Sequence, residues 1–146
     1  TYLIAAEAAL LSGGDPTPYI NTLRRRAAYR NPDDYRGYEN AKDGVANLAK
    51  MGYNYQVALA AMTVKRDQID LDFILDEKSR ELCGEQLRFF DLARTGKLVE
   101  RVQLYNPEQP AKANVRDFHR LRPIPQSQID LMTNEDKANY QNPGYN

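Results

Sequence analysis

Histidine, cysteine and tryptophan are nearly absent from this sequence of 146 residues, which has one histidine, one cysteine and no tryptophan. A single cysteine, Cys83, cannot form a disulfide within the chain, and with the lone His119 it cannot build a cysteine- and histidine-rich metal site. Cys83 lies among helix-forming residues, so we expect a packed and inert thiol. For His119 we expect a structural or surface role, and for the whole chain neither a metal nor a cofactor.

An excess of one charge is also absent, because Lys and Arg total 20 and Asp and Glu total 20. Proteins that bind nucleic acid usually concentrate basic residues on one face, so we expect no nucleic-acid partner. The basic run Arg24-Arg25-Arg26 is more typical of a solvated or ion-paired helix face than of a phosphate site. No stretch approaches the roughly 18 consecutive apolar residues that a membrane span needs.

What the sequence does contain is helical periodicity, beginning with an expected helical hairpin over residues 1–29. Alanine and leucine fill residues 1–12 and favour a helix, which Gly13-Gly14 ends. A second helix follows, with Thr17 as its N-cap and Pro18 at its first position. Its expected apolar stripe consists of Ile20, Leu23 and Ala27. Two short helices joined by a glycine-rich turn are typical of one tetratricopeptide-like unit.

Helical periodicity is strongest over residues 70–104. Asp70 is the expected N-cap of a helix that continues to Gly84. A second helix is expected over residues 85–95, followed by a short third one. The expected inward-facing residues of the second helix are Leu87, Phe89, Phe90 and Leu92.

Two stretches are poorer in regular structure. Over residues 30–66 we expect a loop-rich excursion with short helices near 41–51 and 55–62, because proline, glycine and asparagine interrupt the pattern. Residues 106–146 are rich in proline, asparagine and glutamine, and they predict an extended tail with a short helix near 126–132. The predicted fold is therefore mainly α, with tetratricopeptide-like helix pairs, long loops and an extended, proline-rich C-terminal strap.

Charged residues crowd the segment 77–94. They are Glu77, Arg80, Glu81, Glu85, Arg88, Asp91 and Arg94. Spacings of three and four are those of ion pairs on helix surfaces, and Glu77, Glu81 and Glu85 are expected along one helix side. Paired carboxylates also serve glycoside hydrolases, which leaves a hydrolase using one of these glutamates as an alternative. Acids beside arginines have lowered pKa values, which suits a general acid poorly. We therefore expect a structural ion-pair lattice and no catalytic residue.

Half of the ten tyrosines fall between residues 29 and 55. Aromatic faces stack on the C–H faces of sugars, while hydroxyl and amide groups bond to sugar hydroxyls. The candidate ligand-binding residues in this stretch are Tyr35, Tyr38, Tyr53 and Tyr55. Tyrosines in loops also serve as packing anchors, and the sequence alone favours packing over binding.

Three sequence segments together resemble one protein family. The first is residues 2–8 (YLIAAEA) followed by residues 20–27 (INTLRRRA). The second and most specific is residues 74–96, with the runs ILDE, REL, GE and RFFDL. The third is residues 121–130 (LRPIPQSQID), closed by QNPGY at residues 141–145. Their order and spacing over nearly the whole chain are similar to the C-terminal region of the SusD/RagB family.

The resemblance implies that residues 1–146 are the C-terminal portion of a longer SusD-like protein. It implies a surface lipoprotein of the outer membrane in a Bacteroidetes-type bacterium, held by an N-terminal lipid anchor outside this sequence. Proteins of this kind bind oligosaccharides without catalysis and deliver them to a SusC-like, TonB-dependent transporter. Glycan binding and delivery is therefore the leading hypothesis. A tetratricopeptide-like scaffold for a protein partner remains an alternative, and a glycoside hydrolase a weaker one.

Overall fold

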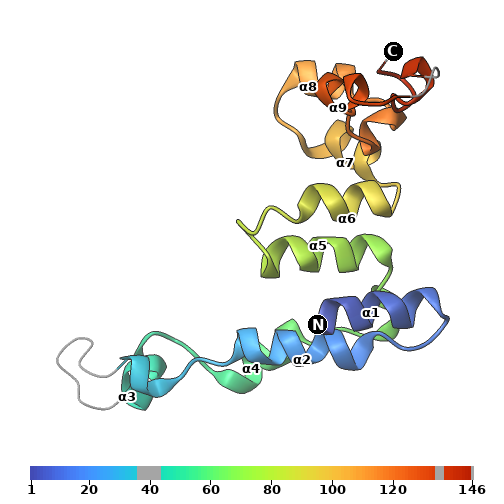
Figure 1. Ribbon diagram of the computed structural model, residues 1–146. Helices are drawn as coiled ribbons and strands as arrows, with labels where there is room; N and C mark the ends of the chain where they lie inside the picture. Colours follow the sequence, from blue (N-terminus) through green and yellow to red (C-terminus); the bar gives the residue numbers. More distant parts are fainter. Residues whose placement is uncertain (36–43, 134–136, 146) are drawn as a thin grey trace. The chain divides into compact units, whose positions relative to one another are not determined.

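The computed structural model describes residues 1–35, 44–133 and 137–145 (Figure 1). Within these ranges the chain is mainly helical and has no β-strand, so the predicted mainly α fold is confirmed. The chain divides into two compact units, residues 1–81 and residues 82–146. The tetratricopeptide-like character of the helix pairs stays a prediction.

The first unit is an assembly of short helices, in which α1, α2 and α5 share an apolar core. It contains α1 (Tyr2–Leu11), α2 (Thr17–Ala28), α3 (Gly44–Lys50), α4 (Tyr55–Met62) and α5 (Leu71–Glu81), with the 3-10 helices η1 (Pro32–Tyr35) and η3 (Arg66–Gln68). Helices α1 and α2 form the expected hairpin, α5 packs on α1, and α4 packs on α2. The core residues are Leu3, Ala6, Ile20, Leu23, Val64, Ile69 and Ile74. Ala6 and Ile20 are fully buried, so a small side chain of α1 and a large one of α2 share this core.

Two details of α2 differ from the sequence prediction. Thr17 is not the N-cap; Asp15 supplies a capping oxygen instead, because its Oδ1 accepts the backbone N–H of Thr17 at 2.9 Å. The side chain of Thr17 and, after it, this backbone hydrogen bond lower the pKa of the Asp15 carboxyl group. The predicted apolar stripe shifts at its end, since Ala28 is buried and Ala27 is exposed. Ala28 lies on the same helix face as Ile20, eight residues earlier, which the helical period allows.

Helix α5 begins as predicted and ends early. Asp70 is confirmed as its N-cap, because Asp70 Oδ1 accepts the N–H of Phe73 at 2.7 Å. The helix ends at Glu81 rather than continuing to Gly84. Gly84 has φ +85° and Gln86 has φ +59°, which is left-handed backbone that a helix cannot contain.

The second unit is built on a chain of short helices. It contains α6 (Arg88–Arg94), α7 (Leu98–Tyr105), α8 (Gln109–Asn114) and α9 (Gln126–Asp130), with the 3-10 helices η4 (Asp117–Arg120) and η5 (Lys137–Asn139). Helix α7 packs on α6, α8 and η4. Since α6 starts three residues later than predicted, the helix start at Glu85 was wrong. Phe90, predicted to point inward, is 60% exposed, while Leu92 of the same helix is buried.

The C-terminal tail is less extended than predicted. Helix α8 interrupts it, and this helix tolerates Pro110 because a helix needs no N–H donor in its first turn. The predicted short helix near 126–132 is confirmed as α9. Irregular backbone does remain between η4 and α9, at residues 121–125.

The LRPIP and QNPGY motifs of the tail are joined by hydrogen bonds. The side chain of Gln141 donates to Ile124 O at 2.9 Å and accepts from Ile124 N at 2.8 Å. The hydroxyl of Tyr145 donates to Leu121 O at 2.8 Å. Between them, Gly144 has φ +91° and lies against the ring of Phe118, where a Cβ atom would come within 2.4 Å. The two motifs are therefore parts of one structural element.

Candidate functional site

A surface hollow of about 340 Å³ lies in the first unit, where α2 ends and α4 begins. Figure 1 shows α3 beyond the neighbouring ends of α2 and α4. The hollow is lined by Tyr29, Arg30, Pro32, Val45, Leu48, Ala49, Tyr53, Asn54, Tyr55 and Gln56. We call it the tyrosine hollow. Concave sites with apolar and aromatic linings and a few polar groups are typical of small-ligand binding.

The hydroxyl group of Tyr53 helps to build the hollow. It donates to Ala28 O at 2.7 Å and accepts the backbone N–H of Arg30 at 3.2 Å. These two bonds connect the C-terminal end of α2 to the segment just before α4, although more than twenty residues of sequence separate the bonded residues. Tyr53 can therefore offer a ligand its ring, while its hydroxyl is already occupied.

The start of α4 is fixed by Asn54. This side chain is the N-cap of the helix, and its Oδ1 accepts the N–H groups of Gln56 at 2.9 Å and Val57 at 3.2 Å. Asparagine is among the preferred N-cap residues because its side-chain oxygen satisfies donors that the first turn leaves without partners. The cap fixes the backbone on which Tyr55 stands.

The other side of the hollow depends on a glycine. At Gly44 a Cβ atom would lie 1.7 Å from Pro32 O, so only glycine lets α3 approach η1 this closely. The approach brings Pro32 together with three residues of α3, namely Val45, Leu48 and Ala49. We call these four residues the apolar wall of the hollow, and the remaining lining residues the polar wall.

Two tyrosine rings of the polar wall contact each other. The rings of Tyr29 and Tyr55 are 5.8 Å apart between centroids and stand at 88°, an edge-to-face pair. Such pairs are favourable because the positive edge of one ring meets the negative face of the other. Tyr29 is 55% exposed, so much of its surface remains accessible to a ligand.

The structure brings together some of the predicted binding tyrosines. Tyr53 and Tyr55 both line the hollow. Tyr35 belongs to η1, but its side chain, like all of Tyr38, lies outside the described part of the structure. The sequence does not predict Tyr29 as a binding residue, because Tyr29 is the last residue of the expected hairpin over residues 1–29. Its closeness to the other tyrosines in the sequence was the signal that could have identified it.

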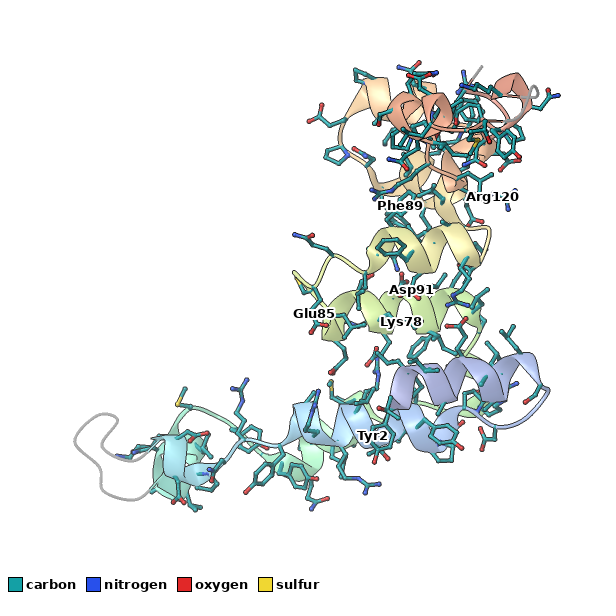
Figure 2. The ribbon with its side chains drawn as sticks, in the orientation of Figure 1. Tyr2, Lys78, Glu85, Phe89, Asp91 and Arg120 are labelled. Carbon is teal, nitrogen blue, oxygen red and sulfur yellow. The ribbon has the colours of Figure 1, made fainter. Side chains whose placement is uncertain are left out.

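The charged residues of α5 bind mainly to α1 and α2. Both oxygens of Glu77 accept from Arg24, at 3.1 and 3.0 Å, and Oε2 also accepts from Arg80 at 2.6 Å. Lys78, labelled in Figure 2, places its Nζ 2.9 Å from Glu7 Oε2, and both side chains are buried, at 7% and 6% exposure. We call these five residues the ion-pair cluster. Its charges are paired as burial requires.

The electrostatics of α5 do not favour the hydrolase alternative. Burial alone would raise the pKa of Glu77, but hydrogen bonds from Arg24 and Arg80 outweigh burial and lower that pKa below its ordinary value of 4.5. Glu81 pairs with Arg26 of α2. A general acid must hold a proton near neutral pH, and the lowered pKa of Glu77 makes this residue unsuited to that role.

The observed ion pairs of this segment differ in part from those of the predicted lattice. Glu85 lies in the turn after α5 (Figure 2), so the predicted row of three glutamates along one helix is wrong. Glu77 pairs with Arg80, and Asp91 pairs with Arg94 at 3.2 Å, so these two pairs lie within the predicted set. The partners supplied by α2 were missed, because helix spacing does not reveal contacts between distant segments.

Two further properties of the described residues bear on function. No three His, Cys, Asp or Glu side chains in the described ranges are grouped so that they could hold a metal ion. Within the same ranges, every helix is too short or too polar to cross a membrane.

Comparison with known proteins gives one match. The model of the SusD family matches residues 1–145, and all three of the recognised sequence segments lie within that match. No curated protein and no solved structure matches the chain. Proteins of the SusD family are generally non-catalytic, glycan-binding proteins of nutrient uptake, associated with the outer-membrane surface. With nearly its whole length matched, the chain belongs to the SusD family.

Proposed function

We propose that this chain binds glycans without catalysis, through the tyrosine hollow, in a surface protein that delivers oligosaccharides to a SusC-like, TonB-dependent transporter. The observation that carries this proposal is the exposed aromatic lining of the hollow in a chain of the SusD family. The outer-membrane location and the N-terminal lipid anchor, which would lie outside this sequence, are part of the same proposal.

Binding would use the rings that folding leaves accessible. Tyr29 offers an exposed aromatic surface, and Tyr55 stands at a right angle to it. A sugar ring that stacks on one of these rings would bring its hydroxyls close to the edge of the other and to the amide of Gln56. Such an arrangement binds and orients a sugar but offers no acid and base pair.

The state of the acids supports the non-catalytic part of the proposal. Glu77 is held by two arginines and its pKa is lowered, and Glu81 is held by Arg26. No acidic residue lines the hollow among the residues that the structure describes. A glycoside hydrolase needs two carboxyl groups beside the bound sugar. We therefore propose capture of the glycan and its release unchanged.

Titration of the chain with a panel of neutral and charged oligosaccharides tests the proposal. We expect at least one glycan to bind, and we expect Tyr29→Ala to weaken its affinity about tenfold through the loss of an aromatic contact. The matched control is Tyr105→Ala, since Tyr105 is 67% exposed and belongs to the second unit. Unchanged affinity in Tyr29→Ala, or no binding of any glycan, would contradict the proposal.

One observation favours the scaffold alternative. Helix α4 is rich in apolar residues, yet none of them is buried, and Val57 is 66% exposed. An exposed apolar helix can dock a protein partner. Recovery of a transporter protein with the chain, in the absence of binding to any glycan, would favour the scaffold function over the glycan function.

A further inference from the structure

The two walls of the tyrosine hollow differ in chemistry. The apolar wall, which consists of Pro32, Val45, Leu48 and Ala49, offers carbon atoms only from its side chains. The polar wall carries hydroxyl, amide and guanidinium groups. A ligand that fills the hollow therefore meets hydrogen-bonding groups on one part of its surface and hydrocarbon on another.

Some polar groups of the polar wall already form hydrogen bonds within the protein. The hydroxyl of Tyr53 bonds to the backbone at Ala28 and Arg30, and Asn54 Oδ1 bonds to two N–H groups of α4. The ligand must find its hydrogen bonds on the rest of the wall, which includes Tyr29, Tyr55 and Gln56. A sugar hydroxyl that points away from the polar wall therefore finds few hydrogen-bond partners in the hollow.

A hexose carries hydroxyl groups around its whole ring. A hydroxyl that faced the apolar wall would lose its bonds to water and gain none in return, which is unfavourable. A methyl group in the same place would instead gain contacts with Val45 and Ala49, which are both accessible from solvent. The hollow therefore discriminates between a hydroxyl and a methyl group on the side of the apolar wall.

On the basis of the proposed function, we propose that the tyrosine hollow takes a sugar ring that bears a methyl group. The methyl group lies on the apolar wall and the hydroxyls face the polar wall. Two kinds of sugar have this chemistry: acetamido sugars, whose methyl belongs to the acetyl group, and 6-deoxy sugars, whose methyl replaces the C6 hydroxymethyl group.

Matched pairs of probes test this assignment on the whole chain. N,N′,N″-triacetylchitotriose and cellotriose differ in an acetamido group against a hydroxyl, and L-fucose and L-galactose differ in a methyl against a hydroxymethyl group. We expect the methyl-bearing member of at least one pair to bind about tenfold more tightly than its partner. The pair that shows this preference identifies the kind of sugar.

Two variants test whether the preference for methyl-bearing sugars depends on the apolar wall. Val45 is 61% exposed, so Val45→Asn should fold normally and should remove the preference by giving the wall a polar group. The matched control is Val57→Asn on α4, because Val57 is 66% exposed and does not line the hollow. We expect Val57→Asn to keep the full preference.

The outcomes separate this inference from the proposed function. Equal binding within both pairs, with Tyr29→Ala still weakening that binding, would overturn the methyl assignment and leave glycan binding intact. A preference that survives in Val45→Asn would also overturn the assignment to this wall. If no glycan binds at all, the proposed function fails and this inference fails with it.

Discussion

The ion-pair cluster and the tyrosine hollow lie in the same unit, yet they use polar atoms in opposite ways. In the cluster, Lys78 and Glu7 are buried and each charge is paired inside the protein. In the hollow, the Tyr53 hydroxyl and the Asn54 side-chain oxygen form hydrogen bonds to backbone groups, while Tyr29 stays exposed. Polar contacts thus build both regions, but only the hollow leaves a surface for a ligand.

The largest expected effect concerns the cluster. Lys78→Ala removes the ammonium group that pairs with the buried carboxylate of Glu7, and we expect the first unit to lose about 3–5 kcal/mol of unfolding free energy. Urea denaturation measures this loss. The double variant Glu7→Gln, Lys78→Met should regain much of the stability, because neither position then carries a buried charge.

A matched control sharpens that comparison. Lys50 is an exposed lysine at the end of α3, so Lys50→Ala should change stability by less than about 0.5 kcal/mol. If Lys50→Ala and Lys78→Ala gave similar losses, the cluster would have no special structural role.

The next largest expected effect concerns the apolar wall of the hollow. Gly44→Ala would place a Cβ atom 1.7 Å from Pro32 O and would push α3 away from η1. We expect a loss of about 1–3 kcal/mol in stability and at least a tenfold loss of glycan affinity. Titration with the best glycan of the panel, beside urea denaturation, checks both values. Full affinity in this variant would mean that the apolar wall does not contribute to binding.

A smaller effect is expected when the Tyr53 hydroxyl is removed. Tyr53→Phe keeps the ring but leaves the Ala28 carbonyl and the Arg30 N–H without this bond, which should cost about 1 kcal/mol. Glycan affinity should fall only through loss of positioning, and therefore less than in Tyr29→Ala. Tyr105→Phe is the control, since its side chain is 67% exposed. A Tyr53→Phe variant with weaker affinity than Tyr29→Ala would place the main ligand contact on the Tyr53 hydroxyl.

The smallest effect is a pH dependence of the cluster. The pKa of Glu77 in the folded chain lies below its ordinary value of 4.5, so its stabilising contribution is present above that pH and is lost as the pH falls through the folded pKa. The first unit should therefore lose stability below about pH 4.5, and Glu77→Gln should remove part of that slope. Urea denaturation at a series of pH values tests this. Glu108→Gln, a change at an exposed acid of the second unit, should leave the slope unaltered.

Local features were predictable from the sequence because they depend on neighbouring residues. The α1–α2 hairpin, the N-cap at Asp70 and the short helix α9 follow from periodicity, capping and glycine placement. Element ends were less predictable: α5 stopped at Glu81 because left-handed backbone at Gly84 and Gln86 begins a turn that spacing alone does not reveal. Helix α8 was missed because its proline suggested a loop.

Contacts between distant segments were not predictable by the same reasoning. Glu77 pairs with Arg24, which is 53 residues away, although its sequence neighbours offered arginines at helical spacing. The hollow combines residues on both sides of α3 for the same reason, and the ring of Tyr29 contacts that of Tyr55, which follows both η1 and α3 in the sequence. Family resemblance supplied the function class that neither periodicity nor composition could give.

Amide chemical shifts of the isotope-labelled chain, recorded while the best glycan of the panel is added, test the central claim most directly. We predict that the largest shift changes fall on the amides of residues 29–31, 45–49 and 53–56, the segments that carry the lining residues of the tyrosine hollow. Residues of the ion-pair cluster should change little. Largest changes elsewhere in the chain, with the hollow unaffected, would contradict the assignment of the hollow as the glycan site.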